Sequence, residues 1–170
     1  MSDAVSIREA RCTDLRTVAA FLDDCWRTAY RHLIADDFLD AMSVDERYKG
    51  ILTRYDEKAS EFLMMHEGEQ LIGTAVFGKS FTPGFEEDGE ISAIYLHKDY
   101  IGKGYGHRLF LQVEDALALT GYENLVLDVL SENREALEFY LAHGYRKVDD
   151  QHLTLGTKTY PITILRKTCT

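Results

Sequence analysis

Three glycines, Gly102, Gly104 and Gly106, stand at alternate positions directly before an amphipathic helix pattern, in the segment YIGKGYGHRLF. Glycine weakens the start of a helix unless the backbone turns sharply there or another group must approach it closely. The free N–H groups of a helix N-terminus are a favourable site for phosphate. One glycine is enough for a tight strand-to-helix turn, which is the alternative explanation. Three glycines favour a loop that binds a phosphate compound.

Periodic patterns fill most of the remaining chain. Alternating apolar residues predict strands, and apolar residues three and four apart predict helices. These patterns predict a strand (5–10), a helix (14–30), a helical region that restarts at a Ser43–Glu46 capping box (36–55), a hairpin (61–81), a strand (90–96), the helix after the glycines up to Gly121, a strand (124–130), a helix (133–143) and two strands (145–150 and 160–167). This order predicts an α/β (α+β) fold with a mixed sheet and helices on both faces.

The length of 170 residues suits one hydrophobic core, so we expect a single domain over residues 1–170. Apolar residues make up 45% of the chain and charged residues 28%, which is typical of a globular protein. No signal-peptide pattern and no run of about 18 apolar residues is present. Cys12, Cys25 and Cys169 form no CxxC pair, which argues against a disulfide framework. We therefore expect a cytoplasmic protein.

The charge is strongly negative, with 19 Lys and Arg against 29 Asp and Glu and a formal net charge of -10. This charge repels nucleic acids and anionic membranes, so neither is expected as a partner. A cationic partner is compatible with the charge. The simpler explanation, that surplus acid keeps the protein in solution, is equally compatible.

Two common phosphate-binding signatures fit the glycines poorly. The Walker loop requires Ser or Thr after Gly-Lys, whereas Gly104 follows Lys103. The dinucleotide signature has the spacing GxGxxG and an acid at the end of the next strand. Here the spacing is GxGxG, and Asp128 lies within its strand. A dinucleotide-dependent oxidoreductase is therefore the weaker alternative.

A third signature, [QR]xxGx[GA] after a strand, is that of the GNAT superfamily of N-acetyltransferases, which this chain resembles over most of its length. Gly104 and Gly106 occupy the two glycine positions, and Ile101 stands where the family has Gln or Arg. The resemblance implies a GNAT-like fold with a mixed, mostly antiparallel sheet of seven strands and about four flanking helices. A second signature of the family matches LDVLSENREALEFYLAHGYRKV at Asn133, Ala136, Phe139, Tyr140, Gly144 and Tyr145.

The resemblance implies acetyl-CoA as co-substrate and no metal. The N–H groups of residues 102–107 would hold the diphosphate of coenzyme A, and the backbone of Tyr95 and Leu96 would bond the pantetheine amides. Asn133 would contact pantetheine, cap a helix, or do both. The six histidines show no metal-binding spacing. The expected coenzyme-binding residues are Tyr95, Leu96, Ile101, Gly102, Lys103, Gly104, Tyr105, Gly106, His107 and Asn133.

Acetyl transfer to an amine requires a proton acceptor, because an alkyl ammonium has a pKa of about 10. The resemblance implies Glu90 as general base, with a solvated residue at the strand edge as the alternative. It implies Tyr140 as the general acid that protonates the leaving thiolate, with an ordinary core aromatic as the alternative. The N–H of Leu96 would stabilise the oxyanion. Strand alternation places Glu90, Ser92, Ile94 and Leu96 on one face and Ile91, Ala93 and Tyr95 on the other.

Trp26 and Tyr30 lie one helical turn apart and are expected to line the acceptor pocket, although core packing also explains them. The closing segment HLTLGTKTYPITILRK resembles that of bacterial polyamine acetyltransferases, which implies a polyamine or another small primary amine as acceptor. A peptide amine and a homodimer are also compatible with the family. We expect direct transfer in a ternary complex. The alternative on the same fold is a non-catalytic acyl-CoA-binding module, which the unusual Ile101 would favour.

Overall fold

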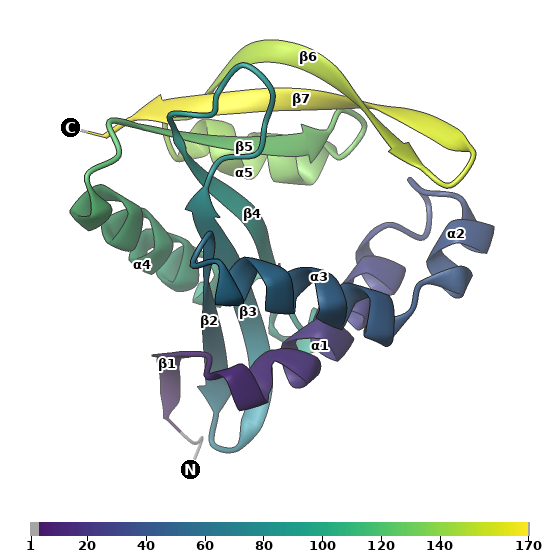
Figure 1. Ribbon diagram of the computed structural model, residues 1–170, viewed down its shortest axis with the longest axis vertical. Coiled ribbons are helices and arrows are strands. Elements are labelled where there is room, and N and C mark those ends of the chain that lie inside the picture. The colour runs from purple at the N-terminus through teal and green to yellow at the C-terminus, as the bar shows by residue number, and fades with distance from the viewer. Residues whose placement is uncertain (1–3, 170) are drawn as a thin grey trace.

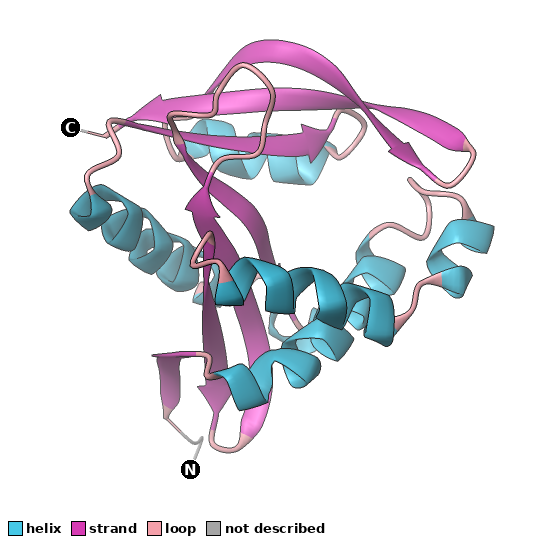
Figure 2. Cartoon of the chain, viewed as in Figure 1, coloured by secondary structure: helices cyan, strands magenta, loops and turns pink. Residues whose placement is uncertain are grey.

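The computed structural model describes residues 4–169, so residues 1–3 of the predicted domain and Thr170 lie outside the described part. The predicted sheet is confirmed: seven strands lie in the order β1-β2-β3-β4-β5-β7-β6, and β4 and β5 are its one parallel pair among the described strands. Figure 1 and Figure 2 show helices on both sides of this sheet. The elements are β1 (Val5–Glu9), α1 (Leu15–Ala29), α2 (Asp36–Ala41), α3 (Val44–Asp56), β2 (Ser60–Glu67), β3 (Gln70–Lys79), β4 (Gly89–Leu96), α4 (Tyr105–Thr120), β5 (Asn124–Leu130), α5 (Arg134–Ala142), β6 (Arg146–Leu155) and β7 (Lys158–Thr168), with short 3-10 turns at Cys12–Asp14 and Lys98–Tyr100.

The predicted restart of the helical region at Ser43 is confirmed. The Ser43 side chain accepts a hydrogen bond from the Glu46 N–H and caps α3, so the region divides into the six-residue α2 and the longer α3. Within residues 4–169, five α-helices therefore flank the sheet, of which α2 is the shortest. The last two strands, β6 and β7, are longer than predicted and form a hairpin around Gly156.

Two apolar layers hold the helices to the sheet. Leu109, Phe110, Val113 and Leu117 of α4 are buried against one face of the central strands. On the other face, α1 and α3 cover a second cluster formed with β2 and β3. The helical stripes predicted from the sequence are the buried faces of α1 and α4.

The parallel strands β4 and β5 separate soon after they pair. Their pairing is confined to Gly89 with Leu125 and Glu90 with Val126, whereas β4 stays paired to β3 as far as Leu96. Figure 1 shows β4 running away from β5 beyond this point. One edge of β4 is therefore left without a neighbouring strand for most of its length.

The ladder between β3 and β4 decides which backbone groups of β4 face this gap. The His97 N–H donates to the Ile72 carbonyl at 2.8 Å. In an antiparallel pair, alternate residues bond the partner strand and those between them point away. The backbone N–H and C=O groups of Tyr95 therefore form hydrogen bonds with β3. Those of Ile94 and Leu96 face the gap. The backbone groups open to a ligand in the gap are therefore those of Ile94 and Leu96, whereas the backbone of Tyr95, predicted to bond pantetheine, is paired with β3.

A bulge in β4 makes the predicted assignment of its faces wrong. The register passes from Val76 opposite Ala93 to Phe77 opposite Ile91, so Ser92 has no partner on β3. An extra residue in one strand reverses the alternation of side chains beyond it. As a result, Ile91 and Ile94 pack in the same layer, the one under α4.

Glu90 is thus placed on the opposite face from the one predicted. Ser92 Oγ lies 3.2 Å from Glu90 Oε2 and accepts a hydrogen bond from Arg54 of α3 at 3.4 Å. Ala93 and Tyr95 pack in the layer covered by α1 and α3. Glu90 therefore shares the α1 and α3 side with Tyr95 and not the α4 side with Ile94.

Candidate active site

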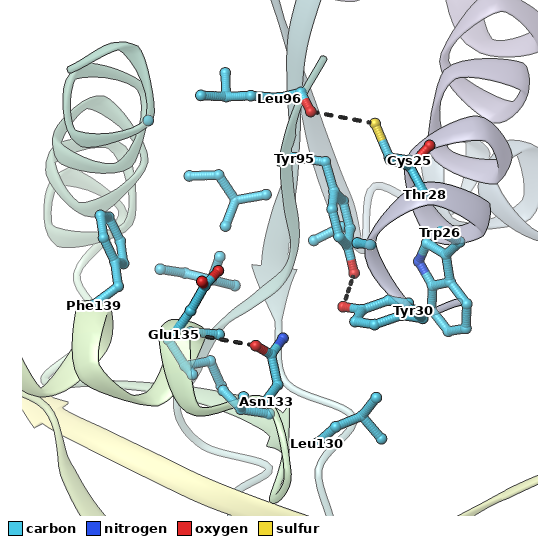
Figure 3. A pocket seen from close by; sticks show the side chains of 18 of the residues that line it. Cys25, Trp26, Thr28, Tyr30, Tyr95, Leu96, Leu130, Asn133, Glu135 and Phe139 are labelled. Atoms are coloured by element: carbon cyan, nitrogen blue, oxygen red, sulfur yellow. Dashed lines mark hydrogen bonds between the residues drawn. The ribbon is translucent and has the colours of Figure 1, made fainter. Parts of the chain in front are cut away.

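The gap between β4 and β5 opens into a cavity of about 620 Å³. Figure 3 shows side chains from α1, β4 and α5 converging on it. The β6–β7 hairpin borders this cavity and is joined to the segment before α2. The Tyr160 hydroxyl of β7 accepts a hydrogen bond from the Ala35 N–H at 2.9 Å. Eight of the predicted site residues line the cavity: Trp26, Tyr30, Tyr95, Leu96, Ile101, Gly106, Asn133 and Tyr140. Glu90 and the loop residues Gly102, Lys103, Gly104, Tyr105 and His107 do not line it.

The glycine-rich loop presents free N–H groups at the start of α4. The first helical hydrogen bond runs from the Arg108 N–H to the Gly104 carbonyl at 3.2 Å. Among the described residues, the backbone N–H groups from Gly102 to His107 have no recorded acceptor. Unpaired donors at a helix N-terminus, in the positive end of the helix dipole, suit a diphosphate.

Glycine is favoured at these three positions for different physical reasons. Gly102 and Gly104 adopt φ values of +80° and +88°, so the backbone itself favours glycine at both positions. Gly106 lies in the first turn of α4 without a positive φ, and an added Cβ would meet only the Leu96 side chain, at 3.4 Å. Its bare backbone borders the cavity. Gly106 is therefore the glycine that ligand approach explains better than the fold does.

Asn133 caps α5 and borders the cavity at the same time. Its Oδ1 accepts a hydrogen bond from the Ala136 N–H at 3.3 Å. This bond leaves the amide NH₂ group of the side chain able to donate toward the cavity. The two roles predicted for Asn133 are therefore compatible.

Tyr140 is half-buried on α5 among aromatic rings, with Phe110 at 5.7 Å and Phe139 at 5.3 Å between ring centroids. It also lines the cavity. Burial raises the pKa of the Tyr140 phenol, and the nearby Tyr30 and Asp128 raise it further. The phenol therefore stays protonated at neutral pH.

Trp26, Tyr30 and Tyr95 form one connected wall on the α1 side. The Tyr30 and Tyr95 hydroxyl oxygens lie 2.7 Å apart, and the Trp26 and Tyr30 rings meet edge to face at 5.1 Å. The guanidinium of Arg47 lies over the Trp26 ring at 5.0 Å and contacts Asp23. Burial raises the pKa of both phenols, most strongly that of Tyr95. The wall is thus neutral, aromatic and fixed in orientation.

Asp128 is a site residue that the sequence reasoning missed. It faces the same side of β5 as Val126 and Leu130, and it lines the cavity. Burial raises the pKa of Asp128, and the charge of Glu90 raises it further. Among the described residues, no other side chain forms a hydrogen bond with Asp128. The signal in the sequence was the acid itself, because a carboxylate inside the apolar strand NLVLDVL needs a reason to be there.

Glu90 lies where β4 and β5 last pair, and it is only 5% exposed. Its carboxylate accepts hydrogen bonds from Thr82 Oγ1, from Ser80 Oγ at 3.4 Å and from Ser92 Oγ at 3.2 Å. The alternative of a solvated residue at the strand edge is therefore wrong. Glu90 is a buried, hydroxyl-bonded carboxylate behind the cavity, close enough to influence Asp128.

In the part of the chain that the structure describes, no group of three or more His, Cys, Asp or Glu side chains could hold a metal ion. None of the described helices is long and apolar enough to cross a membrane.

Known proteins similar to this chain point to one family. The model of the acetyltransferase (GNAT) family matches residues 18–145. An uncharacterized N-acetyltransferase of Bacillus subtilis (strain 168), YuaI, is 28% identical over 160 residues, which cover 89% of this chain and 86% of that protein.

Solved structures of low sequence identity share the fold. The PaiA N-acetyltransferase of Thermoplasma acidophilum, solved in complex with coenzyme A, superimposes with a TM-score of 0.77 at 21% identity, covering 98% of this chain and 99% of that chain. YncA of Salmonella typhimurium, a putative acetyltransferase solved with acetyl-CoA, gives a TM-score of 0.72 at 20% identity, covering 98% of this chain and 94% of that chain.

The family match extends over both signatures recognised in the sequence and over most of the described chain. It excludes the dinucleotide-dependent oxidoreductase that the glycine spacing left open, and it favours an enzyme over the non-catalytic acyl-CoA-binding module. The protein therefore belongs to the acetyltransferase (GNAT) family and is an N-acetyltransferase that uses acetyl-CoA as acetyl donor.

Proposed function

We propose that the protein transfers the acetyl group directly to the nitrogen of a small cationic primary amine, with both substrates bound together. The observation that carries the proposal is the cavity between β4 and β5. It is lined by the coenzyme-side residues Gly106 and Asn133 and by the acceptor-side residues Trp26 and Tyr30. A continuous cavity lets the amine reach the thioester without a covalent acyl-enzyme.

The coenzyme side is assigned to the start of α4 and the free edge of β4. The unpaired N–H groups of residues 102–107 would bind the diphosphate, with the Lys103 ammonium as a nearby cation. The backbone groups of Ile94 and Leu96 that face the gap would bond the pantetheine amides as an added strand does. When bound there, acetyl-CoA supplies an activated acetyl group, and the Leu96 N–H would donate a hydrogen bond to the developing oxyanion.

Proton transfer is assigned to two groups that line the same cavity. A carboxylate removes one proton from the ammonium, and the neutral nitrogen forms a bond to the carbonyl carbon while the carbon–sulfur bond breaks. The Tyr140 phenol gives its proton to the leaving thiolate and recovers one from the new amide nitrogen. The position of Tyr140 on the cavity wall supports this role, and its phenol is protonated at neutral pH, as a proton donor must be.

Two carboxylates compete for the role of base. Glu90 is the base that the family resemblance implies, and it would act through a water because hydroxyl groups surround it. Asp128 lines the cavity and carries a raised pKa, which supports direct contact with the ammonium. We propose Asp128 as the group that contacts the amine, with Glu90 behind it.

Acetylation of a panel of amines tests the proposed function. Release of free thiol from acetyl-CoA is followed with primary amines, amino acids and a peptide with a free N-terminus, and products are identified by mass spectrometry. We expect turnover with small primary amines. Turnover with the peptide alone would contradict the proposal of a small amine, and thiol release without any acetylated product would contradict transfer to an amine.

A further inference from the structure

We propose that the acceptor is a monoamine with an apolar body, and that polyamines are poor acceptors. This inference rests on the proposed transfer to a small primary amine and adds the class of amine. Three observations carry it: one accessible carboxylate in the interior of the cavity on the acceptor side, no second one in that interior among the described lining residues, and an apolar wall where a second ammonium group would have to lie.

Asp128 is suited to anchor one ammonium group. Its neighbours along β5 on the same face are Val126 and Leu130, and the residue directly across on β7 is Ile164. An acceptor ammonium would give this carboxylate the charged partner that these apolar neighbours do not offer. Asp128 is solvent-accessible within the cavity, so an acceptor ammonium can reach its carboxylate and form a charge-assisted hydrogen bond with it.

The other acids near the cavity are poor partners for a second ammonium. Asp24 is strongly exposed at the rim and already lies 3.5 Å from the Arg27 guanidinium. Glu135 lies in the first turn of α5, beside Asn133 on the coenzyme side. Glu90 accepts hydrogen bonds from three hydroxyl groups and does not line the cavity. The interior of the acceptor side therefore offers one carboxylate, Asp128, while Asp24 lies at its exposed rim.

The remaining wall on the acceptor side is apolar. Leu130, Leu153 and Ile162 belong to one apolar cluster of the β5–β7–β6 part of the sheet, and all three line the cavity. Ile34 and the Trp26 ring lie on the α1 side. A second ammonium group against Leu130, Leu153 and Ile162 would lose its hydration without gaining an acceptor, which is costly. The Trp26 ring already carries the Arg47 guanidinium over it, at 5.0 Å. An alkyl or aromatic body would instead be stabilised by burial of its apolar surface.

Hexylamine and 1,6-diaminohexane test the inference as a matched pair. They share the reacting amine and the length of the chain, and they differ only in the terminal ammonium. We expect kcat/KM, measured by thiol release from acetyl-CoA, to be about 100-fold higher for hexylamine, because the diamine buries an unpaired charge. Spermidine is expected to behave like the diamine.

Two variants on β6 test whether the apolar wall causes the preference for hexylamine. Leu153→Glu introduces a carboxylate into the apolar wall and should raise kcat/KM for the diamine at least about 10-fold relative to hexylamine. Thr154→Glu adds the same charge on the opposite, exposed side of the strand and should leave the ratio as in the unmodified protein. Circular dichroism of both variants verifies that the fold is retained, and the ratio in the unmodified protein does not depend on either variant.

The outcomes separate this inference from the proposed function. Equal or better acetylation of the diamine by the unmodified protein would overturn the monoamine inference while supporting transfer to a small amine. Acetylation of neither compound, nor of any other small amine, would overturn both. A strong preference for hexylamine that Leu153→Glu reduces and Thr154→Glu does not would support both.

Discussion

The hydroxyl oxygen of Tyr30, the C-cap residue of α1, lies 2.7 Å from the hydroxyl oxygen of Tyr95 on β4. This hydrogen bond ties the helix that forms the acceptor wall to the strand whose free edge borders the coenzyme side (Figure 3). Either hydroxyl can donate, and burial keeps both phenols protonated. The two tyrosines therefore act as one positioning unit between the two halves of the site.

Removing either hydroxyl should weaken the positioning of the amine. Tyr30→Phe and Tyr95→Phe each lose the same hydrogen bond, which contributes about 1 kcal/mol, so we expect the KM of the amine to rise about fivefold with little change in the KM of acetyl-CoA. The double variant should be no worse than the worse single variant, because one bond is shared. Tyr48→Phe on α3, remote from the cavity lining, is the control. Additive losses in the double variant would show that the two hydroxyls act separately.

Tyr140→Phe tests the proton donor. The phenyl ring preserves the aromatic packing but has no proton to give to the thiolate, so kcat should fall about 100- to 1,000-fold. The Kd of coenzyme A, measured by calorimetry, should stay the same. Because the pKa of Tyr140 is raised, kcat of the unmodified protein should not decline through ionisation of this phenol below pH 10. Unchanged turnover of Tyr140→Phe would remove the acid role.

The pH dependence of kcat/KM shows whether Asp128 or Glu90 is the general base. A base must be deprotonated to act, so a raised pKa of Asp128 moves the acidic limb of the profile above the usual range of an aspartate. Asp128→Asn should abolish this limb and lower kcat/KM about 100- to 10,000-fold. Glu90→Gln removes a negative neighbour, which lowers the pKa of Asp128 and should shift the limb to lower pH. The reverse result, with loss of the limb only in Glu90→Gln, would assign the base to Glu90.

Two alanine variants, Gly106→Ala and Gly104→Ala, test why glycine is favoured at each position. The proposed cause is ligand approach at Gly106 and backbone conformation at Gly104. Gly106 has a helical backbone with room for a methyl group, so alanine there should preserve or slightly raise the melting temperature while weakening coenzyme A at least about 10-fold. Gly104 has a φ of +88°, so alanine there should lower the free energy of unfolding by about 1 kcal/mol. Unchanged coenzyme affinity in Gly106→Ala would contradict the proposed phosphate contact.

The ion pair between Asp88 and Arg166 links the segment before β4 to β7. Arg166 donates two hydrogen bonds to the Asp88 carboxylate, at 2.7 and 2.8 Å, and Asp88 is 3% exposed. Arg166→Met leaves the buried carboxylate without its partner and should lower the free energy of unfolding by about 3 kcal/mol. Adding Asp88→Asn should recover part of this loss, which chemical denaturation measures. Equal losses in the single and double variants would indicate that the arginine side chain acts through packing alone.

The order of the elements, the glycine loop and the second family signature were predictable from the sequence. Each depends on residues close together in the chain: apolar spacing for the helices, Ser43 for the start of α3, and positive φ angles for Gly102 and Gly104. The predicted position of Tyr140 beside the cavity also follows from a local motif. Its role, and that of the loop in coenzyme binding, remain predictions.

The bulge at Ser92 and the role of Asp128 depended on the tertiary structure. The bulge arises from the pairing of β4 with β3, and it changes which side Glu90 faces. The exposure of Asp128 to a cavity arises because β4 leaves β5 after two pairs of residues. Local sequence determined the secondary structure because backbone preferences and apolar periodicity act within a few residues. The packing of distant strands decided which carboxylate meets the cavity, because accessibility and charge depend on neighbours that the chain brings together only when folded.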